Sequence, residues 1–226
     1  RHGHKHLINS ARRAVNPPGP EPYFSRIFVH LPNRHTCSIM TFEEIICRTH
    51  PLPKASLDRL REHACEVALP KGSHIVERGK VERSVFFIKK GIARAYTLLD
   101  GREVTFWIGQ EGATVLSLKG YVNNEAGYET VELMEDAVLF RLRHADLQAL
   151  FAQDGNIANW GRKYAETELL ATEERLITFL QTPATTRYET LLRDAPELLQ
   201  RLPLSSIASY LGITPVSLSR IRAHLK

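Results

Sequence analysis

The sequence lacks long hydrophobic runs and has few cysteines. Its apolar runs span only a few residues, far short of the roughly 20 that cross a bilayer, and no apolar signal-peptide core follows the basic start. Cys37, Cys47 and Cys65 are widely spaced and form no CxxC pair, which argues against a disulfide framework, a zinc site and an iron–sulfur cluster. We therefore expect a cytoplasmic protein with free thiols, no bound metal and no membrane contact.

Charge is distributed unevenly along the 226 residues, which carry a net charge of +5. Residues 1–39 hold six Lys/Arg against one acidic residue, residues 40–181 hold 18 against 21, and residues 182–226 hold six against three. Basic ends on a mildly acidic body are typical of a protein whose one end meets nucleic acid, although solvated basic faces give the same pattern.

Residues 1–39 contain the run Pro-Pro-Gly-Pro-Glu-Pro, which prevents a helix or a central strand. We interpret this segment as a flexible Pro-rich extension. Its alternating His2, His4 and His6 are more often incidental than metal ligands. Organised sequence begins at Met40, which is a candidate for the biological start.

The next hundred or so residues predict two short helices followed by many short strands. Helical spacing covers residues 41–49 and 54–64, and strand-like alternation begins at residue 67. Glycines separate the runs HIVE, SVFFIK, IARAYTLL, EVTFWIG, ATVLSL, YETVELM and AVLFRLR, and Asp100-Gly101 indicates a hairpin. Residues 40–143 are therefore expected to form an antiparallel, jelly-roll-like β-roll with leading helices.

The pattern then becomes helical, so the chain as a whole is α+β. HADLQALFAQ predicts a short helix and residues 156–181 a long one. Apolar residues lie on more than one side of the long helix, so we expect it to pack on the roll and also to form a homodimer through residues 157–180. Burial wholly within one chain is the alternative. Residues 144–181 thus form the linker and dimerisation helix.

Residues 182–226 predict short helices around a hinge. Thr182-Pro183 marks one helix start, Ser205 or Ser206 is expected to cap the helix SIASYLG, and Gly212 permits a sharp exit. Thr214 then caps a last helix with Pro215 in its first turn.

The last helix is predicted to bury Leu218, Ile221 and Leu225 and to present small residues and arginines outward. Such a helix suits the DNA major groove, where an arginine reads guanine, while hydroxyls and a capped helix start hold phosphates. The candidate DNA-binding residues are Ser205, Ser206, Thr214, Pro215, Val216, Ser217, Arg220 and Arg222.

Residues 65–226 resemble the Crp/Fnr family of bacterial transcription regulators. The stretches LPKGSHIVERGKVERSVFFIKKGIARAYTLLDGREVTFWIGQEG and IASYLGITPVSLSRIRAHL carry the resemblance, and EERLITFL is similar to the short Bacteroidetes-type members. The resemblance implies a cyclic-nucleotide-binding-like sensor roll, a (winged) helix-turn-helix, and a homodimer. It also implies a two-fold symmetric double-stranded DNA operator and RNA polymerase as partners.

The sequence departs from the cyclic-AMP-binding members, in which a Gly-Glu-Leu turn and an Arg-Ser pair hold the ribose and the phosphate. The matching positions here are Leu116-Ser117-Leu118 and Tyr128-Glu129. A cyclic phosphate would then be buried without an arginine and beside a like charge. We therefore expect no cyclic AMP and predict no cofactor; a different small-molecule effector, or none, is left open. The candidate effector-pocket residues are Ser117, Leu118, Tyr128 and Glu129.

The DNA-reading helix departs as well. The best-known members usually read bases with Arg, Glu and Arg, and this sequence has Pro215, Val216 and Arg220 at those positions. Arg220 keeps a guanine contact, whereas Val216 suits a thymine methyl. The sequence therefore predicts an operator of its own, and its short spacing around Ser205 predicts a reduced wing.

Three other interpretations compete with a DNA-binding regulator. A cupin-like metalloenzyme needs a His-x-His set, and only His74 and His144 lie in or just after the strands, so we expect no enzyme and no catalytic residue. A haem would use His74, His144 or Cys65, each of which is more often structural. The third is a ligand-sensing or scaffolding β-roll protein that has lost specific DNA binding.

Overall fold

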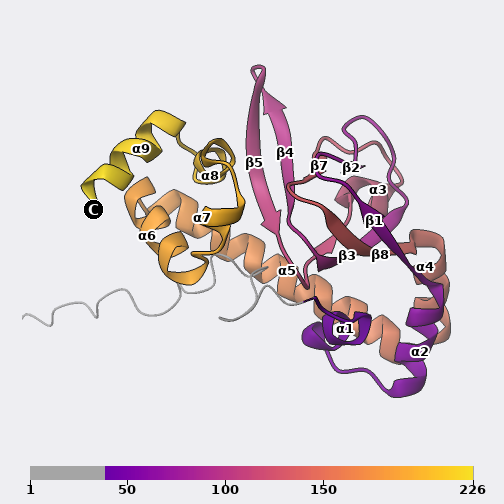
Figure 1. The fold of residues 1–226 in the computed structure, drawn as a ribbon. Coiled ribbons are helices and arrows are strands. Elements are labelled where there is room, and N and C mark those ends of the chain that lie inside the picture. Colours follow the sequence, from indigo (N-terminus) through magenta and orange to yellow (C-terminus); the bar gives the residue numbers. More distant parts are fainter. Residues whose placement is uncertain (1–38, 226) are drawn as a thin grey trace, which may run out of the picture.

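The computed structural model describes residues 39–225, in which two antiparallel sheets face each other and helices surround them (Figure 1). The first sheet has the order β1-β8-β3-β6, made of β1 (Ala64–Leu69), β8 (Ala137–Arg143), β3 (Ser84–Lys90) and β6 (Thr114–Val115). The second has the order β2-β7-β4-β5, made of β2 (His74–Val76), β7 (Thr130–Leu133), β4 (Ala93–Leu99) and β5 (Arg102–Gly109). The predicted α+β fold with an antiparallel β-roll is confirmed. The predicted extension over residues 1–39 lies, apart from Ile39, outside the described residues.

The hairpin of β4 and β5 turns at Asp100-Gly101, as predicted. Both residues have positive φ, 51° and 74°, which is the geometry of a two-residue hairpin turn. Leu99 pairs with Arg102 directly across it. The hairpin extends beyond the rest of the roll and β5 is the edge strand of its sheet (Figure 1).

The core between the two sheets consists of aliphatic and aromatic side chains that alternate inward along the strands. Ile88, Leu133 and Leu139 in this core are fully buried. Gly91 allows the turn between β3 and β4, because its φ is +117° and a Cβ there would lie 2.6 Å from the Ala137 Cβ. The sheets are thus held close at this corner.

A second core joins the roll to four helices: α1 (Phe42–Thr49), α2 (Lys54–His63), α4 (His144–Gln153) and α5 (Gly155–Gln181). Thr41 caps α1 and forms a capping box with Glu44, and Phe42 packs edge-on against Phe87. Trp160 of α5 donates its Nε1 hydrogen bond to the Ile46 carbonyl over 2.9 Å. The start of α5 is therefore fixed to α1 as well as to the roll.

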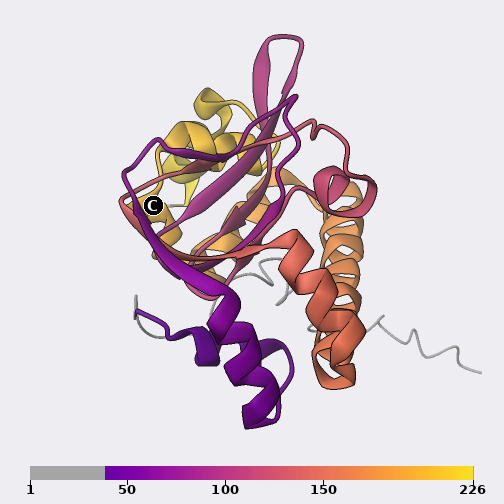
Figure 2. The same cartoon turned by 90° about the vertical axis from the view of Figure 1, so that its right-hand side faces the viewer.

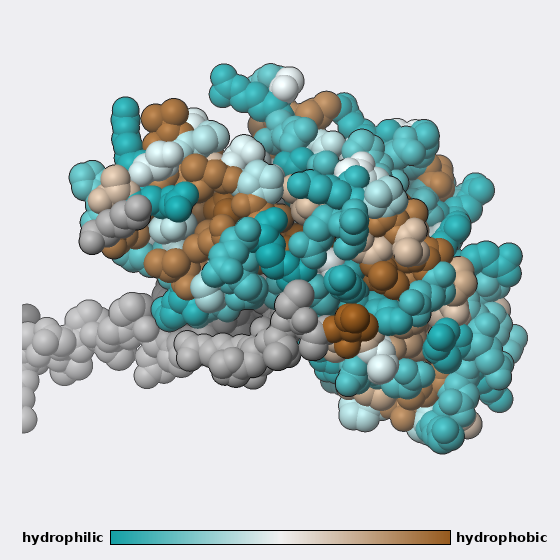
Figure 3. Space-filling model, in the orientation of Figure 1, coloured by the Kyte–Doolittle hydropathy of each residue, from teal (hydrophilic) through white to brown (hydrophobic). Residues whose placement is uncertain are grey.

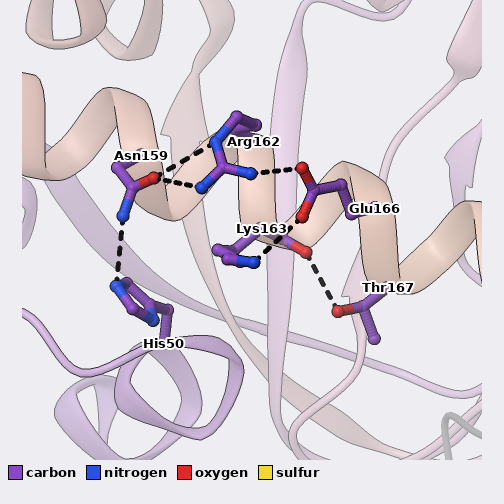
Figure 4. Close-up of polar contacts among 6 residues, drawn as sticks. All are labelled: His50, Asn159, Arg162, Lys163, Glu166 and Thr167. Carbon is purple, nitrogen blue, oxygen red and sulfur yellow. Dashed lines mark hydrogen bonds and ion pairs between the residues drawn. The ribbon is translucent and has the colours of Figure 1, made fainter.

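Helix α5 is the longest helix of the described chain and runs alongside the roll, antiparallel to α4 (Figure 2). Its predicted extent is confirmed. Its first half carries a polar network on the outer side: Asn159 Nδ2 donates to His50 Nε2 over 3.2 Å, and Arg162 pairs with Glu166 one turn on (Figure 4). This side of α5 is suited to water rather than to a core.

Residues 113–118 correct the prediction of a full strand over ATVLSL. Only Thr114–Val115 pairs as β6, and α3 (Leu118–Asn123) follows. The Ser117 side chain accepts a hydrogen bond from the Gly120 N–H and so caps α3. The capping serine competes with strand propensity here and ends β6 early.

The chain ends in α6 (Ala184–Asp194), α7 (Leu198–Arg201), α8 (Leu204–Tyr210) and α9 (Pro215–His224), which enclose a third core. Ile92, Ile108 and Met134 of the roll belong to the same core, so the helical end packs on the roll. The structure shows no strand in residues 144–225, in agreement with the prediction of a reduced wing.

Two predicted caps are also wrong. Pro183 rather than Thr182 is the N-cap of α6, and Pro203 precedes α8 without any side-chain cap from Ser205 or Ser206. In both cases a proline with extended backbone angles starts the helix.

Among the described residues, no helix combines the length and the apolar character that a membrane span needs.

Candidate functional site

A cavity of about 660 Å³ lies between the roll and α5. Its walls come from β3, β4, β5, β6, α3, β7, α4, α5 and α8. Aromatic side chains form much of its lining: Phe106, Trp107, Tyr121, Tyr128, Phe151, Trp160, Tyr164 and Tyr210. The size is that of a site for a small organic ligand, and the walls are mainly apolar.

Three of the four predicted pocket residues line this cavity. Leu118 at the start of α3 and Tyr128 and Glu129 before β7 all belong to its wall. Ser117 is 1% exposed and caps α3 behind the wall instead of lining it. The expected pocket region is therefore assembled in the fold, and Tyr128 lies with its ring centre 6.1 Å from that of Phe106.

Glu129 is buried at 5% exposure, and neither of its carboxylate oxygens has a hydrogen-bond partner in the described chain. A Cβ on Gly127 would lie 2.9 Å from both oxygens, so the absence of a side chain there makes room for the carboxylate. A buried carboxylate without a donor is costly. It is the type of group that a ligand's hydrogen-bond donor or positive charge would stabilise.

Helix α5 contributes a second carboxylate and a cation to the cavity. Burial raises the pKa of Glu168 to about 7, and burial likewise raises the pKa of the neighbouring Tyr164. Arg175 is the only lysine or arginine among the described lining residues. Its guanidinium lies 3.9 Å from the centre of the Tyr210 ring and donates to the Tyr210 carbonyl, so it connects the cavity to α8.

The helix-turn-helix consists of α8, a turn at residues 211–214, and α9. The Thr214 side chain accepts from the Ser217 N–H and Pro215 begins α9, as predicted. Gly212 has φ +69°, and a Cβ there would lie 2.5 Å from the Phe179 ring of α5. The turn therefore needs glycine both for its backbone and for its contact with α5.

Helix α9 is anchored by Leu218, which is fully buried, and by Ile221, which is partly buried. Leu225 is 43% exposed, which corrects the prediction that it shares this buried face, because the helix already ends at His224. The outward side presents Val216, at 61% exposure, and Arg220.

The other predicted DNA-binding residues divide between surface and core. Ser205, Pro215 and Arg222 are exposed, and Thr214 and Ser217 share hydrogen bonds at the cap. Ser206 is only 4% exposed because it lies on the inner side of α8, so its hydroxyl does not face solvent. This removes Ser206 from the candidate phosphate contacts.

Side chains of α7 and α8 connect this helix-turn-helix to the roll. The Ser209 hydroxyl donates to the Glu103 carbonyl and accepts from the Thr105 N–H, each over 2.9 Å, and so satisfies one acceptor and one donor on the free edge of β5. Arg201 of α7 forms ion pairs with Glu111 and Glu135, and its Nη2 lies 2.7 Å from Glu111 Oε1.

The charges in this Arg201 cluster shift one another's titration. Burial opposes ionisation, but hydrogen bonds from Arg201 and the Gly91 N–H hold the pKa of Glu111 below its usual value. Burial likewise works against the charge of Arg201, but Glu111 and Glu135 raise its pKa overall. The two parts of the chain are therefore held together by complementary charge.

The three residues weighed as haem ligands, Cys65, His74 and His144, do not converge, and His2, His4 and His6 lie outside the described residues. Cys65 lies on β1 in the first sheet and is exposed, whereas His74 lies on β2 in the second. His144 starts α4 with its ring centre 4.4 Å from that of Tyr121. In the described part of the chain, no group of three His, Cys, Asp or Glu side chains could hold a metal ion.

Sequence reasoning missed several residues of the site. Trp160, Tyr164 and Glu168 recur at helical spacing and share the cavity-facing side of α5, a signal that was present in the sequence. No comparable pattern in the sequence marks Ser209 or Arg201, because they bond to residues far away along the chain: Glu103 on β5 and Glu111 after β5.

Residues 66–154 match the family model described as a cyclic nucleotide-binding domain. Several solved structures share the fold at low sequence identity. FixK2 from Bradyrhizobium japonicum is 22% identical, with a TM-score of 0.60, over 72% of this chain and 84% of that one. The c-di-GMP-responsive global regulator CLP from Xanthomonas campestris is 16% identical, with a TM-score of 0.63, over 76% and 91%.

A CooA variant from Carboxydothermus hydrogenoformans is 16% identical, with a TM-score of 0.57, over 86% of each chain. No curated protein matches the chain. The comparisons thus confirm the predicted cyclic-nucleotide-binding-like domain and the overall fold.

Proposed function

We propose that this chain, which contains a cyclic nucleotide-binding domain and has the fold of the Crp/Fnr-family regulators, is a sequence-specific DNA-binding transcription regulator. The observation that carries the proposal is the α8–α9 pair. A glycine turn and a Thr-Pro cap join the helices, Leu218 anchors α9, and Arg220 stands outward. A helix held on one side and offering an arginine on the other suits the major groove.

The outer surface of α9 supports recognition of a distinct operator. Arg220 is exposed and makes no ion pair with any described residue, so its guanidinium is available to a guanine. Val216 offers only an apolar contact, such as one with a thymine methyl. Ser205, Thr214, Pro215, Ser217 and Arg222 are the proposed phosphate and flanking contacts.

The second half of α5 supports a homodimer. Leu169, Leu176 and Leu180 are 72%, 58% and 77% exposed, and within this half of the helix only Ala171 and Thr178 are buried among the described residues. In the view of Figure 3, hydrophobic surface also gathers over the helical C-terminal part of the molecule. A self-complementary helix face of this kind is buried by a two-fold related copy, which matches a two-fold symmetric operator.

The roll is the proposed effector sensor and RNA polymerase the further partner, with the cytoplasm as the place of action. An effector in the cavity contacts α5, and Arg175 links that helix to Tyr210 at the end of α8, the first helix of the helix-turn-helix. Occupancy can thereby change how α8 and α9 are held.

The test is selection of binding sequences from random duplex DNA with the full-length protein, followed by titration of the enriched site. Arg220→Ala is expected to lose about 1–3 kcal/mol of binding free energy, or roughly 5- to 150-fold in affinity. Arg193→Ala is the matched control, since Arg193 is an exposed arginine of α6 that pairs with Asp194. Failure of the wild type to enrich any sequence, with equally poor binding by the wild type and Arg220→Ala, would favour a scaffolding β-roll protein instead.

A further inference from the structure

The cavity combines walls that suit an apolar ligand with a buried negative charge. Besides its aromatic rings, it holds Glu129 on the roll side and Glu168 on α5. Glu129 has no hydrogen-bond partner for either carboxylate oxygen and is 5% exposed. The neighbouring Gly127 cannot supply one, because its N–H already donates to the Lys80 carbonyl.

The positive charge of the cavity lies elsewhere. Arg175, the one arginine or lysine among the described lining residues, stacks on Tyr210 and donates to its carbonyl. It belongs to the second half of α5, whereas Glu129 immediately precedes β7. A ligand phosphate placed at Glu129 would meet a like charge without an opposing arginine.

Aromatic walls and a carboxylate are the usual surroundings of an organic cation. Ring faces attract ammonium groups, and a carboxylate accepts their hydrogen bonds and neutralises their charge. Phe106 and Tyr128 form a neighbouring ring pair on the wall that also includes Glu129. A cavity of about 660 Å³ leaves room for an apolar body behind such a group.

We propose that the effector of this cavity is a small aromatic or alicyclic amine, whose ammonium group is held by Glu129 and whose apolar body lies among Phe106, Trp107 and Trp160. The proposal rests on the proposed function, in that it names the ligand of the sensor roll. It also gives a reason for Glu129, a buried carboxylate without an internal donor.

The raised pKa of Glu168, about 7 through burial, is consistent with this chemistry. A carboxyl that titrates near neutral pH would ionise fully when a cation enters the same cavity, because an opposite charge favours its charged form. The ionised Glu168 carboxylate then adds a second negative charge that stabilises the bound cation.

The test uses two fluorescent probes with the same dansyl group and carbon chain but different charge: dansylcadaverine, which carries a primary ammonium group, and its N-acetylated neutral form. Each is titrated into the full-length protein, and into the Glu129→Gln and Glu125→Gln variants. Glu125 is an exposed carboxylate on the same loop and is the matched control.

The wild type and Glu125→Gln are expected to bind the cationic probe about 10-fold or more tightly than the neutral one, as one paired charge would confer. Glu129→Gln should reduce this preference to about 2-fold or less. The cationic probe should also raise the melting temperature of the wild type and not that of Glu129→Gln. Without a probe, Glu129→Gln should melt no lower than the wild type, because it removes an unpartnered charge.

Three results would overturn the proposal: equal binding of both probes by the wild type, an unchanged preference in Glu129→Gln, or displacement of dansylcadaverine by cyclic AMP at equal concentration. Absence of binding by either probe would overturn it as well, since an accessible apolar cavity should take the dansyl group. None of these results depends on DNA. Loss of specific DNA binding with intact probe binding would refute the regulator proposal alone.

Discussion

The contact of Arg201 with Glu111 gives the sharpest test of how the helix-turn-helix is held against the roll. Glu111 is 2% exposed, and Arg201 donates to both of its carboxylate oxygens, over 3.1 and 2.7 Å. In Arg201→Met the carboxylate keeps its backbone hydrogen bonds, including the one from the Gly91 N–H 2.9 Å away, but loses its cation. Breaking a buried ion pair costs about 3–5 kcal/mol, and the remaining backbone donors place our expectation near the lower end, about 3 kcal/mol.

The measurement is urea unfolding at a fixed protein concentration, with a double-mutant cycle. Glu111→Gln removes the charge, so Arg201→Met should cost much less in that background, with a coupling energy of about 2 kcal/mol. Arg193→Met, which breaks an exposed pair with Asp194, is the control and should change the free energy of unfolding by less than about 1 kcal/mol. Additive effects of the two substitutions would refute the argument.

The same contact fixes the sign of a pH effect. The pKa of Glu111 is lower in the folded protein than in the unfolded chain, mainly because hydrogen bonds from Arg201 and Gly91 outweigh burial. Stability from this group is therefore present above its unfolded pKa and is lost as pH falls through the folded one. In Arg201→Met the free energy of unfolding should no longer fall with pH in this range. An unchanged slope of the free energy of unfolding against pH would contradict the assignment of the effect to the Arg201–Glu111 contact.

Three further predictions concern α5 and α8. Ser209→Ala leaves the Thr105 N–H without its acceptor and should lower the free energy of unfolding by about 1–2 kcal/mol in urea titrations; no change would contradict the edge contact. Burial raises the pKa of Glu168 from 4.5 to about 7, so stability from this group falls as pH rises through that window. Glu168→Gln should therefore raise the free energy of unfolding at pH 8 by about 1–3 kcal/mol, a value reduced to allow for the partial exposure of the side chain, and should hardly change it at pH 5. Equal gains in urea titrations at both pH values would contradict a raised pKa of Glu168. Leu180→Glu, at a 77% exposed position, should convert a dimer into monomers in light scattering, and an unchanged mass would place the interface elsewhere.

Local chemistry made much of the fold predictable. The Asp100-Gly101 turn, the cap of Thr214 before Pro215 and the extent of α5 each depend on neighbours in sequence, and each is confirmed. The errors have a local cause too. Ser117 caps a short helix where strand-forming residues precede it, and prolines begin helices where serine or threonine was expected.

The sequence by itself determined the order of a β-roll, a long helix and a helix-turn-helix, because hydrophobic period, turn residues and caps act over a few residues. Only the tertiary structure decided that Glu129 and Glu168 share one cavity, that Arg201 faces Glu111, and that Ser206 points inward. Such contacts join residues far apart in the chain. They follow from how the helices dock on the two sheets, which no short-range pattern specifies.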